Sequence, residues 1–258
     1  MSIGARGWTN SIGMELVWIP PGSFLMGSPD GERGRLDWEG PVHKVNLSKG
    51  FYMGATEVTQ GEYLEVMGTN PSYLNGGVFG VDLGRPVEQV RWLDSLELAR
   101  RLSEREGRRG EPTPCPPRRS RSTRVGPVRR RDSPSGMLWN ATKYAGPAQL
   151  PMNTSKWCEN SGGAKPVGQK KPNSWGVFDL HGNVWAWCRD SWDGSLLYDA
   201  LEVTDPGGDS GTFRVVRGRD WSNFLRSCRS ANRSYYFAAE RSYNIGFRVV
   251  LVSGLPGE

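Results

Sequence analysis

The sequence offers few of the side chains that perform covalent or metal chemistry, and these lie far apart. The four cysteines form no CxxC pair and are Cys115, Cys158, Cys188 and Cys228. With only His43 and His181 beside them, a zinc or haem site would have to be assembled from scattered residues. No nucleophile motif accompanies His181, which favours a hydrogen-bonded turn residue over a general base. The residue types therefore predict no metal ligand and no catalytic residue.

A different chemistry is concentrated near the C-terminus, where residues 222–244 are rich in tyrosine, serine and asparagine. Three of the chain's eight tyrosines fall within 235–243. Tyrosine supplies a large, rigid contact area with few rotors to freeze, and serine and asparagine adapt their hydrogen bonds, as in antibody paratopes. The composition favours a binding surface. The alternative reading is that these tyrosines are ordinary loop aromatics that cover an edge of the core.

The positive charge of the chain is confined to one segment. The net charge is +6, and residues 107–131 contribute nine arginines and one acid, Glu111, so the rest of the chain carries a charge of −2. An arginine run can neutralise phosphates, but this one holds no aromatic side chain that could stack on bases. Nucleic-acid binding is therefore not expected. Four prolines between 112 and 117 exclude a helix or an interior strand there.

Length and composition fit one domain over 1–258 that buries its core without disulfides or metals. No run approaches the ~20 apolar residues of a membrane span, and no export signal is visible at the N-terminus. The cytoplasm is the default compartment, and surface display stays open if the native start lies upstream. Cys188 and Cys228 could pair under oxidising conditions, although buried thiols are the commoner state.

Short strands and two helices must position the C-terminal stretch. The spacing predicts two strands within 14–28 that form a hairpin around Pro20-Pro21-Gly22, followed by strands at His43–Leu47 and 51–55. The sequence Thr59-x-x-Glu62 predicts a capping box and a helix to about Val66. A second helix is expected from about Asp94, followed by an atypical Arg/Pro-rich insertion at 107–137 and renewed order around 139–157. Strands at Phe213–Arg217 and 246–251 bracket the last region, so the fold class is α+β.

Several blocks of sequence, in a fixed order along the chain, resemble the formylglycine-generating-enzyme domain family. They are residues 13–28, 56–59, 85–90, 165–168, 172–185, 214–218 and 246–248. The resemblance implies a C-type-lectin-like fold with short mixed sheets, two main helices, extensive loops and buried tryptophans such as Trp185 and Trp187. Fold alone does not give the chemistry. After the second helix, the family has a further block of sequence. At the corresponding place, residues 113–124 of this chain are rich in Arg and Pro, which is what a GC-rich gene for that block would encode if it were read in a shifted frame.

The enzymatic features that the resemblance implies are incomplete. Enzymes of the family hold copper with two cysteines, but alignment places Asn223 at the first position and leaves only Cys228. A calcium site that the family would place around Asp179, Gly182 and Val184 lacks its glutamate, since Ala186 stands there, so calcium near Asp179 is a weakened alternative that stays open. No cofactor is therefore expected. A cysteine oxidase, or another catalytic member of the family, is the alternative function.

The C-terminal region 220–250 is similar to the variable region of proteins diversified by retroelements. There, a framework such as 228–233 and 245–248 separates clusters of Asn codons whose adenines are randomised. Substitution at the first two codon bases reaches Ser, Tyr, Phe, Asp, Leu and Arg but not Lys, Glu, Gln, Met or Trp. Ten residues here lie in the reachable set: Ser222, Asn223, Phe224, Ser227, Ser234, Tyr235, Tyr236, Ser242, Tyr243 and Asn244.

These ten positions define the predicted ligand-binding surface, and its expected partner is an unidentified protein or other macromolecule. Leu225, Phe237 and Asp220 could belong to this surface or to its support. Arg229, Arg233 and Arg241 are expected to brace the loops by bonding carbonyls and carboxylates. The sequence thus predicts a non-catalytic binding protein, and it is silent about the ligand and the oligomeric state.

Overall fold

Three small sheets and two helices make up the part of the protein that the structure, a computed structural model, describes: residues 7–107, 162–192, 194, 201–206, 211–223 and 228–251. The first sheet, in the order β1-β2-β5-β11, consists of Gly7–Thr9, Glu15–Ile19, Phe51–Gly54 and Val250–Leu251. The second, β3-β4-β7, consists of Gly22–Met26, His43–Leu47 and Val203–Thr204. The third, β10-β6-β8-β9, consists of Ile245–Gly246, Trp185–Ser191, Phe213–Arg217 and Arg233–Phe237.

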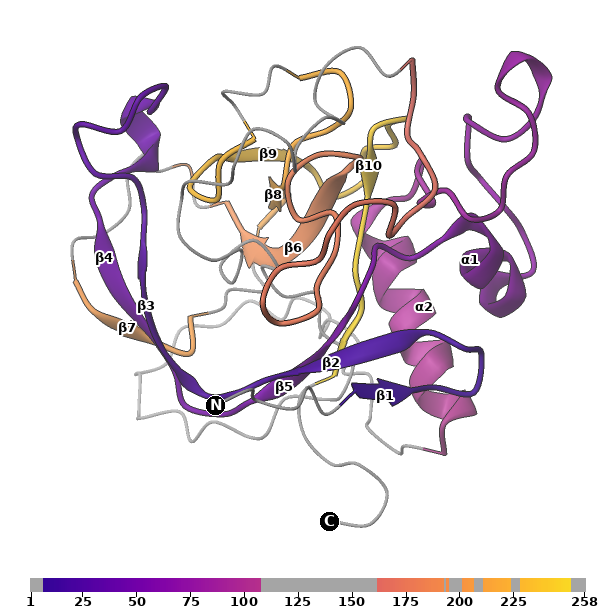
Figure 1. The fold of residues 1–258 in the computed structure, drawn as a ribbon, viewed down its shortest axis with the longest axis horizontal. Coiled ribbons are helices and arrows are strands. Elements are labelled where there is room, and N and C mark those ends of the chain that lie inside the picture. Colours follow the sequence, from indigo (N-terminus) through magenta and orange to yellow (C-terminus); the bar gives the residue numbers. More distant parts are fainter. Residues whose placement is uncertain are drawn as a thin grey trace, which may run out of the picture.

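The sheets and helices surround a common interior. In Figure 1, β2 and β5 run along the bottom, β3 and β4 stand at the left, and the helices α1 (Gln60–Met67) and α2 (Trp92–Arg105) lie at the right. The sheet that contains β9 lies above the centre. This mixture of two helices with short mixed sheets confirms the predicted α+β class. In the described part of the chain, neither helix is long and apolar enough to cross a membrane.

The first helix has the ends that its sequence predicts. The Thr59 hydroxyl accepts a hydrogen bond from the Glu62 amide at 3.1 Å, and the Glu62 carboxylate accepts one from the Thr59 amide at 2.7 Å. Gly68 ends the helix with φ 76°, a left-handed conformation that glycine adopts without steric cost. The predicted capping box is confirmed.

The second helix begins two residues earlier than predicted. Its first residue is Trp92, and the Asp94 carboxylate accepts a hydrogen bond from the Arg91 amide at 2.9 Å. Asp94 therefore lies inside the first turn and reaches back to the cap residue, rather than being the cap itself. Leu98 and Leu102 point from this helix into the core, as its apolar spacing predicts.

The hairpin predicted around Pro20-Pro21-Gly22 is wrong, although both of its strands exist. β2 pairs with β1 and β5, whereas β3 pairs with β4 in a different sheet. Two consecutive prolines lack the two amide donors that a hairpin would use. The chain therefore passes from one sheet to another at this point, and β2 and β3 do not pair. β4 is confirmed over His43–Leu47, and β5 ends at Gly54, one residue before the predicted end.

The single strand predicted at 246–251 is also wrong, because two separate short strands share this segment. β10 pairs in parallel with β6, and β11 pairs antiparallel with β5, so this segment crosses from one sheet to another. Gly246 permits the crossing, because a Cβ there would lie 2.5 Å from the Val87 carbonyl oxygen. A continuous strand could not serve both sheets. β8 is confirmed over Phe213–Arg217.

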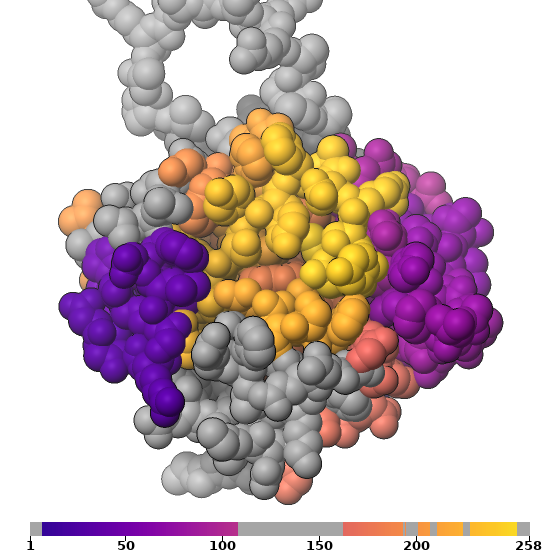
Figure 2. Space-filling model, turned by 90° about the horizontal axis from the view of Figure 1, so that it is seen from above, coloured from indigo at the N-terminus to yellow at the C-terminus, as the bar shows by residue number. Residues whose placement is uncertain are grey.

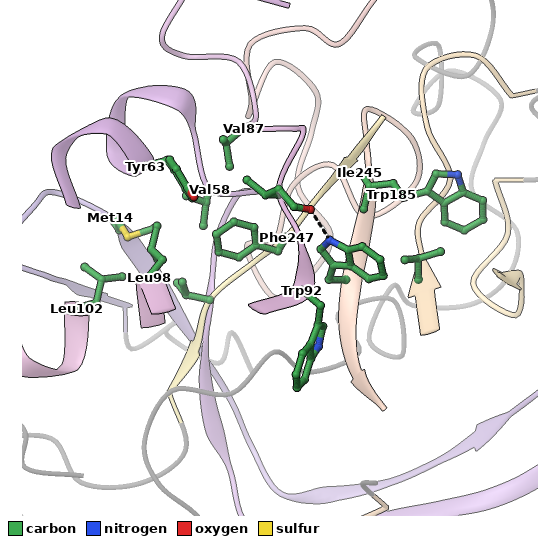
Figure 3. Close-up of a cluster of buried hydrophobic side chains, with 14 of the residues drawn as sticks. Met14, Val58, Tyr63, Val87, Trp92, Leu98, Leu102, Trp185, Ile245 and Phe247 are labelled. Atoms are coloured by element: carbon green, nitrogen blue, oxygen red, sulfur yellow. Dashed lines mark hydrogen bonds between the residues drawn. The ribbon is translucent and has the colours of Figure 1, made fainter. Parts of the chain in front are cut away.

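The largest apolar cluster lies between α2, β6 and the crossing segment. Figure 3 shows Phe247 beside Val58 and Tyr63, and the rings of Tyr63 and Phe247 meet edge-on at 6.4 Å. Trp185 and Trp187 are 3% and 1% exposed, which confirms their predicted place in the core. The Trp187 indole donates to the Val90 carbonyl at 2.9 Å. The buried indoles of Trp185 and Trp187 therefore pack the third sheet against the core.

Candidate ligand-binding surface

Region 220–250 occupies the middle of one face of the molecule. Figure 2 views this face from above and shows the yellow C-terminal atoms between indigo atoms of the N-terminal part and purple atoms that precede α2. Of the ten predicted positions, Phe224 and Ser227 lie outside the described residues, as does Leu225. Tyr235 and Tyr243 are 42% and 45% exposed. Two of the three tyrosines on which the prediction depends therefore face solvent.

Strand β9 sends alternate side chains to opposite faces of its sheet. β9 pairs antiparallel with β8, and Tyr235 and Phe237 lie opposite Val215 and Phe213. Tyr236 lies on the other face and meets the buried Trp187 edge-on, with ring centroids 6.4 Å apart. Successive strand residues must alternate in this way. The neighbouring tyrosines 235 and 236 therefore have different surroundings, a division that the codon pattern does not predict.

The outer face of β9 carries a cluster of aromatic rings. Tyr235 stacks on Trp192 with centroids 4.6 Å apart and planes 18° apart, and its ring meets Phe213 edge-on at 5.5 Å. Phe237 lies 4.1 Å from Phe213 and is 48% exposed. The Arg233 guanidinium lies over the Trp192 ring, 4.7 Å from its centroid. Phe237 thus belongs to the surface rather than to its support. Trp192 is only 8% exposed, so it is a buried support for Tyr235 that the sequence reasoning missed.

The inner face has a polar centre at Asp220, which is 1% exposed. One carboxylate oxygen accepts from the Ser222 amide at 2.7 Å and from the Ser222 hydroxyl at 2.6 Å. The other accepts from the Asn244 side chain at 2.7 Å, and Asn244 in turn accepts from Ser242 at 2.6 Å. Asp220 is therefore support, and it joins two predicted clusters that lie far apart in the sequence.

Two further groups near Asp220 complete the inner face. Arg219 donates to the Asn223 side chain at 2.9 Å and to Asn232 at 2.7 Å, so Asn223 is fixed by the framework. Burial and the negative charge of Asp220 both raise the pKa of Tyr236 above its usual 10. The Tyr236 phenol is consequently neutral at physiological pH and offers one donor and one acceptor.

Arg229 braces the region from below through a buried ion pair. Its guanidinium lies 2.7 Å from Glu39, which is fully buried, and 3.3 Å from Glu32, and it also donates to the Gly34 carbonyl. Asn232 donates to the same Glu39 at 3.0 Å. These contacts attach the framework 228–233 to the N-terminal segment 32–39. The predicted bracing role of Arg229 is confirmed.

The other two framework arginines also bond backbone carbonyls. Arg233 donates to the Trp38 carbonyl at 3.1 Å, and Arg241 donates to the Gln89 carbonyl and lies 2.9 Å from Asp94. Their predicted role is confirmed too. Arg229 and Arg233 attach the region to segment 32–39, and Arg241 attaches it to Gln89 and Asp94, so the region is held at two places.

The positions of the enzymatic thiols do not fit a copper ion. Asn223 stands at the first position, and its amide oxygen already accepts from Arg219. Cys228 takes part in a disulfide, whereas Cys188 remains a thiol, so the pairing considered between these two is wrong. A disulfide sulfur is not the thiolate ligand that copper needs. No reaction step is derived through this metal.

The predicted surroundings of a calcium ion are occupied by other groups. The Asp179 carboxylate accepts from the Gly168 amide at 2.6 Å, and the buried guanidinium of Arg248 supplies positive charge beside Asp179 and Glu57. Burial nevertheless raises the pKa of Glu57 to about 8. Ala186 adds no oxygen ligand, and no group of three acidic, histidine or cysteine side chains gathers within the described ranges. These residues do not fit a calcium site.

His181 has the role of a turn residue. Burial lowers the pKa of His181 to about 4, so the ring is neutral at physiological pH. Its place in the bend before β6 fits the predicted turn residue.

The architecture places the chain among C-type-lectin-like proteins. A family model, the sulfatase-modifying factor enzyme 1-like domain, matches residues 9–252, and the chain belongs to this family. The resemblance carried by the sequence blocks is thereby confirmed. The formylglycine-generating enzyme of Streptomyces coelicolor is 27% identical over 94% of this chain and 92% of its own.

Two solved structures share the fold over nearly their whole length. PvdO from Pseudomonas aeruginosa superposes with a TM-score of 0.72 at 25% identity and covers 96% of this chain and 98% of its own. Treponema denticola variable protein 1 superposes with a TM-score of 0.71 at 22% identity and covers 96% and 99%. The fold therefore occurs in a protein described as variable.

Proposed function

We propose that this chain is a non-catalytic binding protein whose contact surface is diversified by a retroelement and recognises a macromolecular partner. The observation that carries the proposal is the pairing of exposed tyrosines with a braced frame. Tyr235 and Tyr243 face solvent, while Arg229 and Arg233 attach the chain before Tyr235 and Asp220 holds Asn244, the residue after Tyr243. Rigid aromatic contact area at low ordering cost is what a binding surface requires.

The replaced active-site positions support the same reading. Where the enzymes hold a thiol pair, this chain has an asparagine bonded to Arg219 and a cysteine in a disulfide. The structure describes eight of the ten positions. All eight are serine, asparagine or tyrosine, and each is exposed or half-buried. Variable protein 1 of Treponema denticola shares this fold, and its name describes the property proposed here.

Comparison of genes from independent isolates tests the diversification. We expect differences to concentrate at the ten positions and to follow substitutions of adenine, and we expect a reverse-transcriptase gene and a second copy of the segment nearby. The framework positions 228–233 serve as the internal control, because they should stay constant. Differences distributed evenly over 220–250 would contradict the proposal.

A catalytic function remains the second candidate, because the chain is 27% identical to a formylglycine-generating enzyme over nearly its whole length. A copper titration in the presence of a cysteine-containing peptide separates the two functions. The proposal predicts no oxidation of the peptide cysteine by mass spectrometry, and a variant Cys228→Ser should behave identically. Turnover that Cys228→Ser abolishes would establish the enzyme instead.

A further inference from the structure

A row of four aromatic rings joins region 220–250 to a loop from a distant part of the chain. Trp221 lies 5.9 Å from Tyr243, Tyr243 lies 6.3 Å from Tyr73, and Tyr73 lies 5.8 Å from Phe79, measured between ring centroids. Tyr73 and Phe79 belong to the loop 68–84 that follows α1. Of the four rings, only Tyr243 occupies a predicted variable position. The surface therefore continues beyond the variable segment onto constant sequence.

The same loop 68–84 also exposes apolar side chains. Tyr73 is 62% exposed, Val78 94% and Val81 73%. Exposed apolar side chains that gather in one place indicate an interaction site, whereas single ones do not. Asp82 is the only charged residue between 68 and 84. A surface that is aromatic, apolar and almost uncharged fits a protein partner and offers no cations for phosphates.

Buried hydrogen bonds hold this loop in place. The Glu88 carboxylate accepts from the Leu74 amide at 2.7 Å, and Arg85 donates to the Phe79 carbonyl at 2.8 Å. Leu74, next to Tyr73, is 2% exposed and packs against Ala164. The loop therefore presents Tyr73 from a fixed backbone, and binding there would order few additional groups.

We propose that Tyr73 and its loop form a constant half of the binding surface, which supplies affinity for protein partners whatever residues occupy the variable positions. This inference rests on the proposed function. The variable residues then select the partner, while Tyr73 and Val78 contribute contact area common to all variants. The ring contact between Tyr73 and Tyr243 makes the two halves continuous.

A selection against a known protein tests the constant half. The ten variable positions are randomised in the full chain, the library is displayed, and binders are selected against lysozyme. Tyr73→Ala is then introduced into several independent binders, and Kd is measured by surface plasmon resonance. We expect Kd to rise at least tenfold in most of them and Val78→Ala to raise it about threefold. Leu25→Ala is the matched control, since Leu25 is 71% exposed on β3.

The outcomes separate this inference from the proposed function. If no lysozyme binder is recovered, the scaffold does not support variable binding and both proposals fall. If binders are recovered but Tyr73→Ala and Val78→Ala both leave Kd within twofold, only the constant half is overturned. Val78 is nearly fully exposed and has little packing to lose, so its variant reports binding even where Tyr73→Ala lowers the urea midpoint.

Discussion

Removing the Asp220 carboxylate should loosen both halves of the inner face at once. The Asn244 side chain is half-buried, so its charge-assisted hydrogen bond to Asp220 contributes about 2 kcal/mol. Ser222 is exposed, so water can replace its two bonds, and these contribute about 0.5 kcal/mol each. Asp220→Ala is therefore expected to lower the free energy of unfolding by about 3 kcal/mol.

Urea unfolding monitored by tryptophan fluorescence measures this loss. With a slope of about 2.5 kcal/mol per molar urea, the midpoint should fall by roughly 1 M. Hydrogen exchange locates the effect, and the amides of 222–223 and the Trp185 amide, which donates to the Asn244 carbonyl, should lose protection. Asp220→Asn is the matched control, because it keeps the shape and one acceptor oxygen but places an NH2 donor where the other oxygen accepts, so it should hold only one of the two clusters and cost less than Asp220→Ala.

A small effect would refute the reasoning. If Asp220→Ala lowers the midpoint by less than about 0.3 M, the carboxylate does not join the two clusters in solution. Equal losses for Asp220→Ala and Asp220→Asn would show that a single acceptor oxygen at position 220 holds neither Ser222 nor Asn244.

Three further predictions concern the support of the surface. Burial raises the pKa of Glu88 from 4.5 to about 7, so the free energy of unfolding should fall by up to about 3 kcal/mol as pH rises from 4.5 to 7. Urea titrations at several pH values measure this fall, and Glu88→Gln should flatten it. An unchanged pH profile in Glu88→Gln would contradict the assignment. Arg229→Ala leaves the buried Glu39 without its cation and should cost about 3 kcal/mol in thermal unfolding, part of which Glu39→Gln should restore. Tyr236→Ser should cost about 1.5 kcal/mol through lost packing, whereas Tyr243→Ser should change stability by less than about 0.5 kcal/mol; equal costs would mean that Tyr236 does not pack against Trp187 as described.

Local signals in the sequence predicted the elements whose ends depend on neighbouring residues. The Thr59 capping box and the end of α1 near Val66 depend on contacts within a few residues, and both are confirmed. The hairpin at Pro20 and the strand at 246–251 failed because sheet membership depends on distant partners. The alternation of apolar and polar residues indicates which face of a strand is buried, but it does not indicate which strand pairs with it.

The candidate surface shows the same division. Codon reasoning identified Tyr235 and Tyr243 as exposed, and bonding preferences identified the arginine braces. It missed Trp192, whose stacking on Tyr235 depends on the end of β6, and Tyr73, which belongs to a loop far from the variable segment. Nothing in the sequence near either residue indicates these ring contacts, because they arise from the tertiary fold.

The different surroundings of the predicted positions have a consequence for the proposed diversification. Position 236 faces the buried Trp187, and position 244 holds Asp220, so substitutions there would alter the support as well as the contact surface. Position 243 faces outward and can change at little cost to folding. Under the proposed function, diversity at the outward positions would be limited only by binding, whereas diversity at 236 and 244 would also be limited by the stability of the fold.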